Sequence, residues 1–313
     1  MLILLFSMSC DKKDYSSEVV KNDYRIKTVK QYSHVELFSM DEYTYVDEQV
    51  TQVVVREKDY SDWVDYRLDE YEYEHPLITI ITNRKSDNIW EPSDKTEYLY
   101  NENNLLTEQC FYNYYGGSWH KEQTYNYTYE NSKIKEVVFM NYGDGWFTTP
   151  SSTIEFIYTN SKLIEIRIFT FNDLYSRELT DKIEVTYPAH NLTELLYFKK
   201  NDEGNWTQEQ ITQLIYSANK LIEINIFTKS DGSDTWNEDL TLNYYYNENG
   251  YLREQNIDNF SVIYEYEIGH GNAALFNHDN VSLFGSIIPL YIELNIPTLK
   301  RYRLDSKNYL NIE

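Results

Sequence analysis

The chain has 313 residues, with 51 acidic and 28 basic side chains and a formal net charge of −23. Its length alone would suggest two domains. So acidic a chain is poorly suited to bind nucleic acid, because that binding depends on Lys and Arg contacts to phosphates. We interpret the charge as a solvated acidic surface and predict no nucleic-acid partner.

The first ten residues form a short apolar run that ends at Cys10. The run is shorter than the ~20 apolar residues of a membrane-spanning helix, and its small residues before the cysteine are typical of an export signal. Ser7-Met8-Ser9-Cys10 resembles the lipobox of bacterial lipoproteins, whose cysteine becomes the lipidated first residue. This resemblance implies an exported protein, anchored by lipid at Cys10 in the outer membrane or at the cell surface. The alternative is a soluble protein with an apolar end.

Residues 11–21 are polar, and we interpret them as a tether between the anchor and the folded domain. The chain has one other cysteine, Cys110, which falls within a predicted strand. The sequence therefore contains no disulfide framework and no cysteine metal site. We expect Cys110 to be a small buried hydrophobic residue.

A unit of about 29 residues repeats over residues 22–268, which predicts one repeat domain in place of two domains. Its first marker is a Tyr before a polar turn, and most copies have a Glu seven or eight residues later. The marker tyrosines, 27 to 30 residues apart, are Tyr45, Tyr73, Tyr100, Tyr129, Tyr158, Tyr187, Tyr216 and Tyr246. The glutamates, which we interpret as a structural or solvated ladder, are Glu108, Glu136, Glu165, Glu194, Glu223 and Glu254.

Each unit contains two runs of alternating polar and apolar residues, which predicts a β-hairpin. In the copy at Tyr158, pairing Tyr158 with Lys162 gives an apolar row in which Phe156 faces Ile164. We favour this register over pairing Tyr158 with Leu163, which would place Phe156 opposite Glu165.

Together the units predict an all-β fold, an antiparallel meander of roughly 16 strands. A sheet of that width must coil, split into two layers or close, because twist accumulates between strands. We expect one wide twisted or coiled sheet. Residues 269–313 lack the repeat markers, so we expect them to form a C-terminal cap over the last strand.

The string Tyr-x-Tyr-x-x-Asn-x-x-Leu runs from Tyr98 to Leu106 and again from Tyr244 to Leu252. It resembles the YD or RHS-type repeat of bacterial cell-surface proteins. In character the chain is similar to uncharacterised Tyr-rich repeat lipoproteins of Gram-negative bacteria. The resemblance implies an exported β-repeat scaffold and brings no catalytic residues with it.

Tryptophans follow the same period, and five of them stand ten residues before a marker tyrosine. Because ten is an even number, we expect each Trp to share the apolar face with its Tyr and to pack in the core. If that face were open, its rows of rings could stack on sugars. The candidate ligand-stacking residues are Trp63, Trp90, Trp119, Trp146, Trp206 and Trp236.

We find no phosphate-binding glycine loop, no Gly-x-Ser-x-Gly elbow and no His-Glu-x-x-His motif in the sequence. We therefore predict no enzymatic activity, no cofactor and no metal site. Turns such as Asp231-Gly232 could hold Ca²⁺, but turn chemistry explains them.

The predicted function is a non-catalytic cell-envelope lipoprotein that acts as a repeat scaffold or as a binding surface for a protein or glycan partner. Carbohydrate binding through the aromatic rows is the alternative, and an unrecognised enzyme is the third. An integral outer-membrane barrel is a further class, because strands of this length and alternation are its signature. We do not favour it, since Gln and Glu occur in the middle of the strands.

Overall fold

The computed structural model describes residues 24–47, 49–142, 148–171, 176–218, 220–229 and 234–268. The predicted export signal with Cys10, the tether, the C-terminal cap, Trp146 and Asp231-Gly232 lie outside these residues.

The described residues form eighteen antiparallel strands, which confirms the predicted all-β meander of hairpins. The strands are β1 (Tyr24–Ser33), β2 (Glu36–Val46), β3 (Gln49–Asp59), β4 (Asp62–Glu74), β5 (Leu77–Ser86), β6 (Ile89–Tyr100), β7 (Leu106–Tyr115), β8 (Ser118–Glu130), β9 (Lys133–Tyr142), β10 (Thr148–Thr159), β11 (Lys162–Phe171), β12 (Arg177–Ala189), β13 (Leu192–Lys200), β14 (Trp206–Ser217), β15 (Lys220–Lys229), β16 (Trp236–Tyr246), β17 (Leu252–Ile257) and β18 (Phe260–Ile268).

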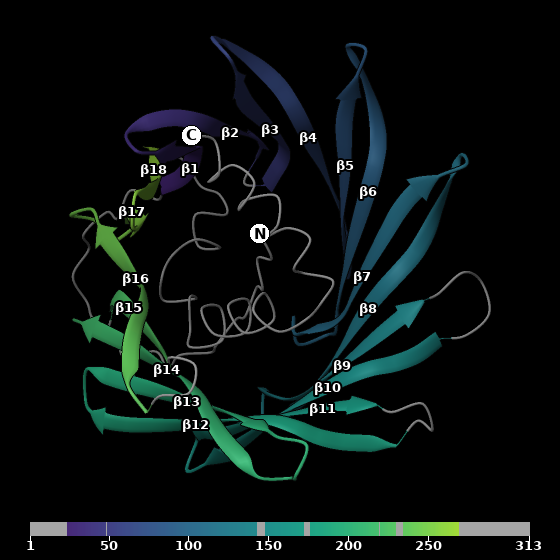
Figure 1. Ribbon diagram of the computed structural model, residues 1–313. Coiled ribbons are helices and arrows are strands. Elements are labelled where there is room, and N and C mark those ends of the chain that lie inside the picture. The colour runs from purple at the N-terminus through teal and green to yellow at the C-terminus, as the bar shows by residue number, and fades with distance from the viewer. Residues whose placement is uncertain are drawn as a thin grey trace, which may run out of the picture.

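The sheet closes on itself, because β1 pairs with β2 on one side and with β18 on the other. The ribbon therefore forms a complete ring of strands (Figure 1). Arg25 and Glu267 face each other across the β1–β18 seam, with a guanidinium nitrogen 2.6 Å from a carboxylate oxygen. The prediction of one wide twisted or coiled sheet is wrong, because the strands close into a barrel. Closure pairs the backbone groups of both edge strands, which an open sheet would leave as a template for other chains.

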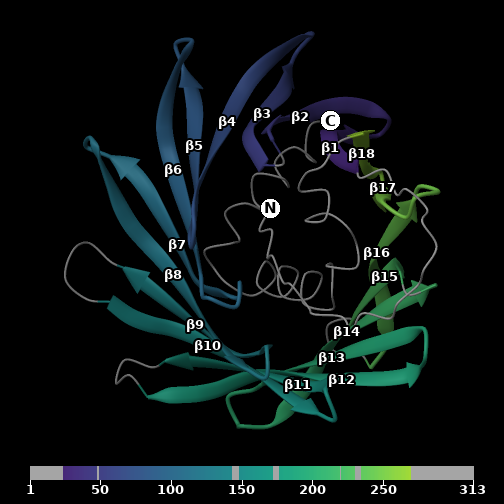
Figure 2. The ribbon, with the colours of Figure 1, turned by 180° about the vertical axis from the view of Figure 1, so that it is seen from behind.

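The ring is splayed towards one end. The turns that join β5 to β6 and β7 to β8 lie at its outer margin, and the opposite ends of these strands lie nearer its middle (Figures 1 and 2). The marker tyrosines end the even-numbered strands from β2 to β16, so they line the narrow end. The tryptophans begin five of these strands, so they line the wide end.

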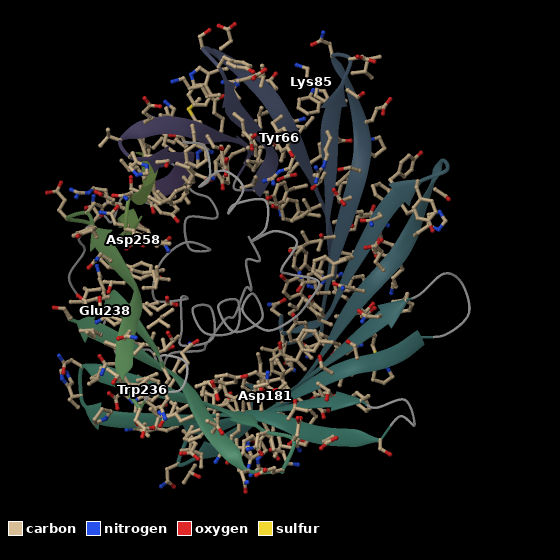
Figure 3. All side chains as sticks on the ribbon, viewed as in Figure 1. Tyr66, Lys85, Asp181, Trp236, Glu238 and Asp258 are labelled. Carbon is tan, nitrogen blue, oxygen red and sulfur yellow. The ribbon has the colours of Figure 1, made fainter. Side chains whose placement is uncertain are left out.

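One face of the strands carries the buried core, and this face, which we call the inner wall, is directed into the ring. Side chains crowd the inner margin of the ring over β7 to β11 (Figure 3). In the copy at Tyr158, the core row runs from Phe156 on β10 to Ile166 on β11 and Ile183 on β12, all at most 4% exposed. The opposite face, which we call the outer wall, carries most of the charged residues.

Tyrosines at the narrow end tie one hairpin to another through a repeated hydrogen bond. Each hydroxyl donates to the carbonyl oxygen of an aliphatic core residue, as Tyr187 does to Leu163 at 2.9 Å. The same bond joins Tyr45 to Ile26, Tyr129 to Leu106, Tyr246 to Leu221 and Tyr266 to Leu252, at 2.7 to 2.8 Å. In these copies the Tyr hydroxyl satisfies a backbone carbonyl. The marker Tyr100 does not make this bond, because its buried hydroxyl has no hydrogen-bond partner among the described residues.

The register favoured for the copy at Tyr158 is wrong. Tyr158 pairs with Leu163, and a two-residue turn of Asn160 and Ser161, both with positive φ, connects the strands. A β-bulge then shifts the pairing between Ile157 and Tyr158, so that Phe156 faces Ile166 instead of Glu165. The apolar row is kept by the extra residue of the bulge, which alternation alone cannot reveal.

Candidate binding surface on the outer wall

A β-bulge lies three residues after every tryptophan that the structure describes. In β14, for example, Gln208 pairs with Phe198 and Gln210 pairs with Tyr197, so Glu209 is the extra residue. The corresponding extra residues are Tyr66 after Trp63, Ser93 after Trp90, Glu122 after Trp119 and Asp239 after Trp236. The bulge is therefore part of the repeat, although no residue type marks it in the sequence.

The extra residue reverses the alternation between a Trp and its marker Tyr. Thr212 pairs with the buried Leu195 on the inner wall, whereas Trp206 pairs with Lys200 on the outer wall. The prediction that the tryptophans share the apolar face with the tyrosines is wrong, because the ten-residue spacing includes a bulge. Trp236 and Glu238 lie on the outside of the ring (Figure 3).

The outer-wall tryptophans are accessible. Trp63 is 40% exposed and Trp206 is 37% exposed, while Trp90, Trp119 and Trp236 are half-buried. Part of each ring is therefore exposed to solvent on the outer wall. Of the six candidate stacking residues, the structure places these five at the wide end of the outer wall, and Trp146 is the one outside the described residues.

Lysines accompany these rings in a regular way. The residue directly opposite Trp on the preceding strand is Lys58, Lys85, Lys200 or Lys229 in four copies, and Tyr114 in the copy at Trp119. The amino nitrogen of Lys85 lies 5.5 Å from the ring centre of Trp90, and that of Lys229 lies 5.3 Å from the ring centre of Trp236. Both distances are within the range of cation–π attraction.

Further aromatic side chains join the tryptophans. Lys182 lies 4.7 Å from the ring centre of Phe198 and 5.4 Å from that of Trp206. Lys95 lies 4.1 Å from the ring centre of Tyr112 and 5.6 Å from that of Trp119. We call the whole set the aromatic–lysine belt; it comprises Trp63, Trp90, Tyr112, Trp119, Phe198, Trp206 and Trp236 with Lys85, Lys95, Lys182 and Lys229.

The recurring glutamates also lie on the outer wall, nearer the narrow end. Glu108 lies 3.3 Å from the Lys121 amine, Glu136 lies 3.4 Å from Arg177, and Glu165 accepts a hydrogen bond from Arg167 at 2.8 Å. Amide nitrogens of Gln213, Asn225 and Asn256 donate to Glu194, Glu223 and Glu254 in the other copies. Each carboxylate thus has a local partner, as expected of a structural ladder.

Cys110 is buried, with 5% of its surface exposed, on the side of β7 that carries Glu108. Its sulfur donates to a Glu108 oxygen at 2.8 Å, and burial raises the pKa of the thiol. A thiol kept protonated in this way is a poor nucleophile, so the buried role expected of Cys110 fits its surroundings.

Within the described ranges, no group of three or more His, Cys, Asp or Glu side chains could hold a metal ion. Nor do those ranges contain a helix long and apolar enough to cross a membrane.

The sequence prediction missed two acidic residues of the inner wall, Asp41 on β2 and Asp69 on β4. Both are 8% exposed. Asp69 accepts a hydrogen bond from the Thr82 hydroxyl at 2.8 Å and lies 3.2 Å from the Arg67 Nε atom. A signal for them exists in the sequence, because both stand four residues before a marker tyrosine, where other copies have neutral residues.

No known protein family matches the sequence, and no curated protein matches it. Among solved structures, a protein of unknown function from Bacteroides fragilis is similar at 15% identity and a TM-score of 0.35, covering 38% of this chain and 90% of its own. A porin-like protein from Bacteroides uniformis is similar at 12% identity and a TM-score of 0.35, covering 77% and 96%. The TcdB2-TccC3 structure is similar at 11% identity and a TM-score of 0.27, covering 70% and 14%. Similarities this weak assign no function to the chain.

Proposed function

We propose that this protein is a non-catalytic, lipid-anchored binding protein of the bacterial cell envelope, and that the aromatic–lysine belt on its outer wall holds the partner. The lipid anchor at Cys10 and export to the outer membrane or cell surface rest on the lipobox-like sequence. The binding role rests on one observation: the same bulge turns five tryptophans outward.

A purely structural role does not account well for this arrangement. A Trp on the inner wall would bury most of its large surface and would stabilise the fold. Here each Trp is instead moved to the outer wall, and the bulge leaves one residue of the strand without a ladder partner. Partly exposed aromatic rings that recur at one level of a protein surface are typical of an interaction site.

Carbohydrate is the ligand class that these rings favour. The rings lie on alternate strands, and two interstrand spacings amount to roughly 10 Å, a distance that two linked sugar rings can span. A sugar presents a face of C–H groups to an aromatic ring, and the neighbouring lysines can donate hydrogen bonds to its hydroxyl groups. Trp206 and Trp236, on β14 and β16, are such a pair.

A glycan array probed with the full-length protein tests the proposal, with Trp fluorescence recorded during titration of any hit. We expect a hit whose affinity falls about tenfold or more in Trp206→Ala and Trp236→Ala, as for the loss of a central aromatic contact. The matched control is Tyr60→Ala, which removes an aromatic ring that is 96% exposed in the β3–β4 turn, outside the belt. Binding that survives both Trp substitutions, or no hit at all, would refute carbohydrate binding by the belt.

A further inference from the structure

The inner wall has a repeat position at which two neighbouring copies differ from the others. This position, four residues before the marker tyrosine, is Asp41 in the first copy and Asp69 in the second. In the next six copies it is Thr96, Tyr125, Ile154, Ile183, Thr212 and Leu242. The fold itself therefore does not require an acidic side chain here, and burying one is costly.

The two carboxylates differ in how well they are satisfied. Asp69 is held by the Thr82 hydroxyl at 2.8 Å and by Arg67 at 3.2 Å. The Oδ1 atom of Asp41 is buried and, in the part of the chain that the structure describes, has no hydrogen-bond partner. A buried carboxylate oxygen left in this state lacks the donor that would offset its loss of water.

Aromatic and apolar residues surround Asp41. Its neighbours in register are Val29 on β1 and Val55 on β3, both at most 5% exposed. Tyr43 follows two residues later on the same strand face, and it packs against both the Val53 and Val55 cluster and the cluster that contains Tyr264. The carboxylate thus lies on an apolar and aromatic part of the inner wall and is largely shielded from water.

Charged groups from the adjoining strands act on Asp41 without pairing with it. Burial raises its pKa to about 6, and Asp69 and Glu57 act in the same direction, whereas Arg67 lowers it. Arg67 forms an ion pair with Asp69, although its Nε atom makes no hydrogen bond among the described residues, and it offsets the effect of burial on Asp41 only in part. At neutral pH Asp41 is therefore mostly ionised, although it is buried and its Oδ1 atom has no hydrogen-bond donor among the described residues.

We propose that Asp41, with the rings of Tyr43 and Tyr264, forms a site on the inner wall for an organic ammonium group. An alkylammonium carries three N–H donors and a positive charge. It would therefore donate the hydrogen bond that Asp41 Oδ1 lacks and would neutralise the charge of the carboxylate. The faces of tyrosine rings attract such a cation as well. The alkyl part would pack against the valines on either side.

Calorimetric titration of the full-length protein with n-butylammonium chloride at pH 7.5 tests the site, with n-butanol as the uncharged control ligand. We expect saturable binding of the amine alone, weakened about tenfold or more in Asp41→Asn, since one partner of a buried charge pair is removed. The matched control is Asp181→Asn, which neutralises an inner-wall carboxylate that already accepts a hydrogen bond from Tyr197 at 2.5 Å. This control should bind the amine as the natural protein does.

The pH dependence provides a second measurement that needs no variant. Affinity for the amine should fall as the pH is lowered through about 6, because Asp41 becomes protonated. The proposal is overturned if the amine does not bind, if n-butanol binds equally well, or if Asp41→Asn binds the amine unchanged while circular dichroism shows it folded.

Discussion

Lys229 on β15 pairs directly with Trp236 on β16, and its amino nitrogen lies 5.3 Å from the centre of the Trp ring. The same cross-strand pair recurs at Lys85 and Trp90, where the distance is 5.5 Å. Lysine beside tryptophan thus recurs at the wide end of the barrel, and the bulge that follows each Trp places the pair on the outer wall.

The Lys229–Trp236 contact should be measurable in a double-mutant cycle. We expect Lys229→Ala and Trp236→Ala to be coupled by roughly 0.5–1 kcal/mol, the size of an exposed cation–π contact. Urea unfolding of the two single variants and the double variant gives this coupling energy. Lys58 and Trp63 are the matched control, because they pair directly across β3 and β4 and no lysine or arginine of the described residues lies over the Trp63 ring. A coupling energy as large in the control pair would contradict the assignment.

Deleting the bulge residue Glu209 should turn Trp206 from the outer wall to the inner wall, because the alternation of β14 before that point is reversed. Trp emission should then shift to the blue, and acrylamide should quench it less. Glu209→Ala, which keeps the extra residue, should leave both properties unchanged. An unshifted spectrum in a folded deletion variant would show that the bulge does not set the direction of Trp206.

These bulges explain which parts of the structure the sequence could predict. The hairpins and the marker tyrosines follow from local alternation, and the structure confirms them. A bulge adds one residue without a characteristic side chain, so counting ten residues from Trp206 to Tyr216 predicted the wrong face. Glu209 and Asp239, which are acidic, occupy the same position as Tyr66 and Ser93, which are not.

Closure could not be predicted for a different reason. It depends on pairing between Tyr24–Ser33 and Phe260–Ile268, at opposite ends of the repeat domain, and nothing in either strand identifies its distant partner. Asp41 and Asp69 could have been found by aligning the copies on their marker tyrosines. An acidic residue at this position occurs in only two of the eight copies, so it is not part of the pattern that defines the repeat.

Removal of Cys10 should release the protein from membranes if the lipobox-like sequence is used. We expect Cys10→Ala to abolish incorporation of labelled palmitate and to move the protein from the membrane fraction to the soluble fraction. Cys110→Ala is the matched control, since it removes the buried cysteine of β7 and should leave both properties unchanged. Retention of label in the Cys10 variant would exclude lipidation at this residue.

The hydroxyl of Tyr187 should stabilise the narrow end of the barrel. Tyr187→Phe removes the 2.9 Å hydrogen bond to the Leu163 carbonyl, and we expect a loss of about 1 kcal/mol in the free energy of unfolding. The control is Tyr100→Phe, because the Tyr100 hydroxyl is buried without a hydrogen-bond partner among the described residues. That variant should be neutral or slightly stabilised in urea unfolding. Equal losses in both variants would show that the repeated tyrosine bond is not the cause.

Because of Asp41, the free energy of unfolding should increase as the pH is lowered from about 6 towards 3.8. Its pKa is raised from 3.8 to about 6 in the folded protein, so the folded state holds a proton more tightly than the unfolded state does. Ionised Asp41 therefore destabilises the folded protein to the full extent above pH 6, and this loss of stability disappears as the pH falls towards 3.8. This difference in pKa between the folded and unfolded states corresponds to on the order of 3 kcal/mol in the free energy of unfolding.

Asp41→Asn should therefore be more stable than the natural protein at pH 7.5, by up to that amount, and the difference should shrink at pH 4.5. Urea unfolding at the two pH values measures it. Asp69 also has a raised pKa, through burial that Arg67 and Thr82 partly offset, so Asp69→Asn serves as a comparison in which the ion pair with Arg67 is lost as well. If Asp41→Asn is destabilised at pH 7.5, then Asp41 has a partner that stabilises its charge, and the site inferred on the inner wall is already filled.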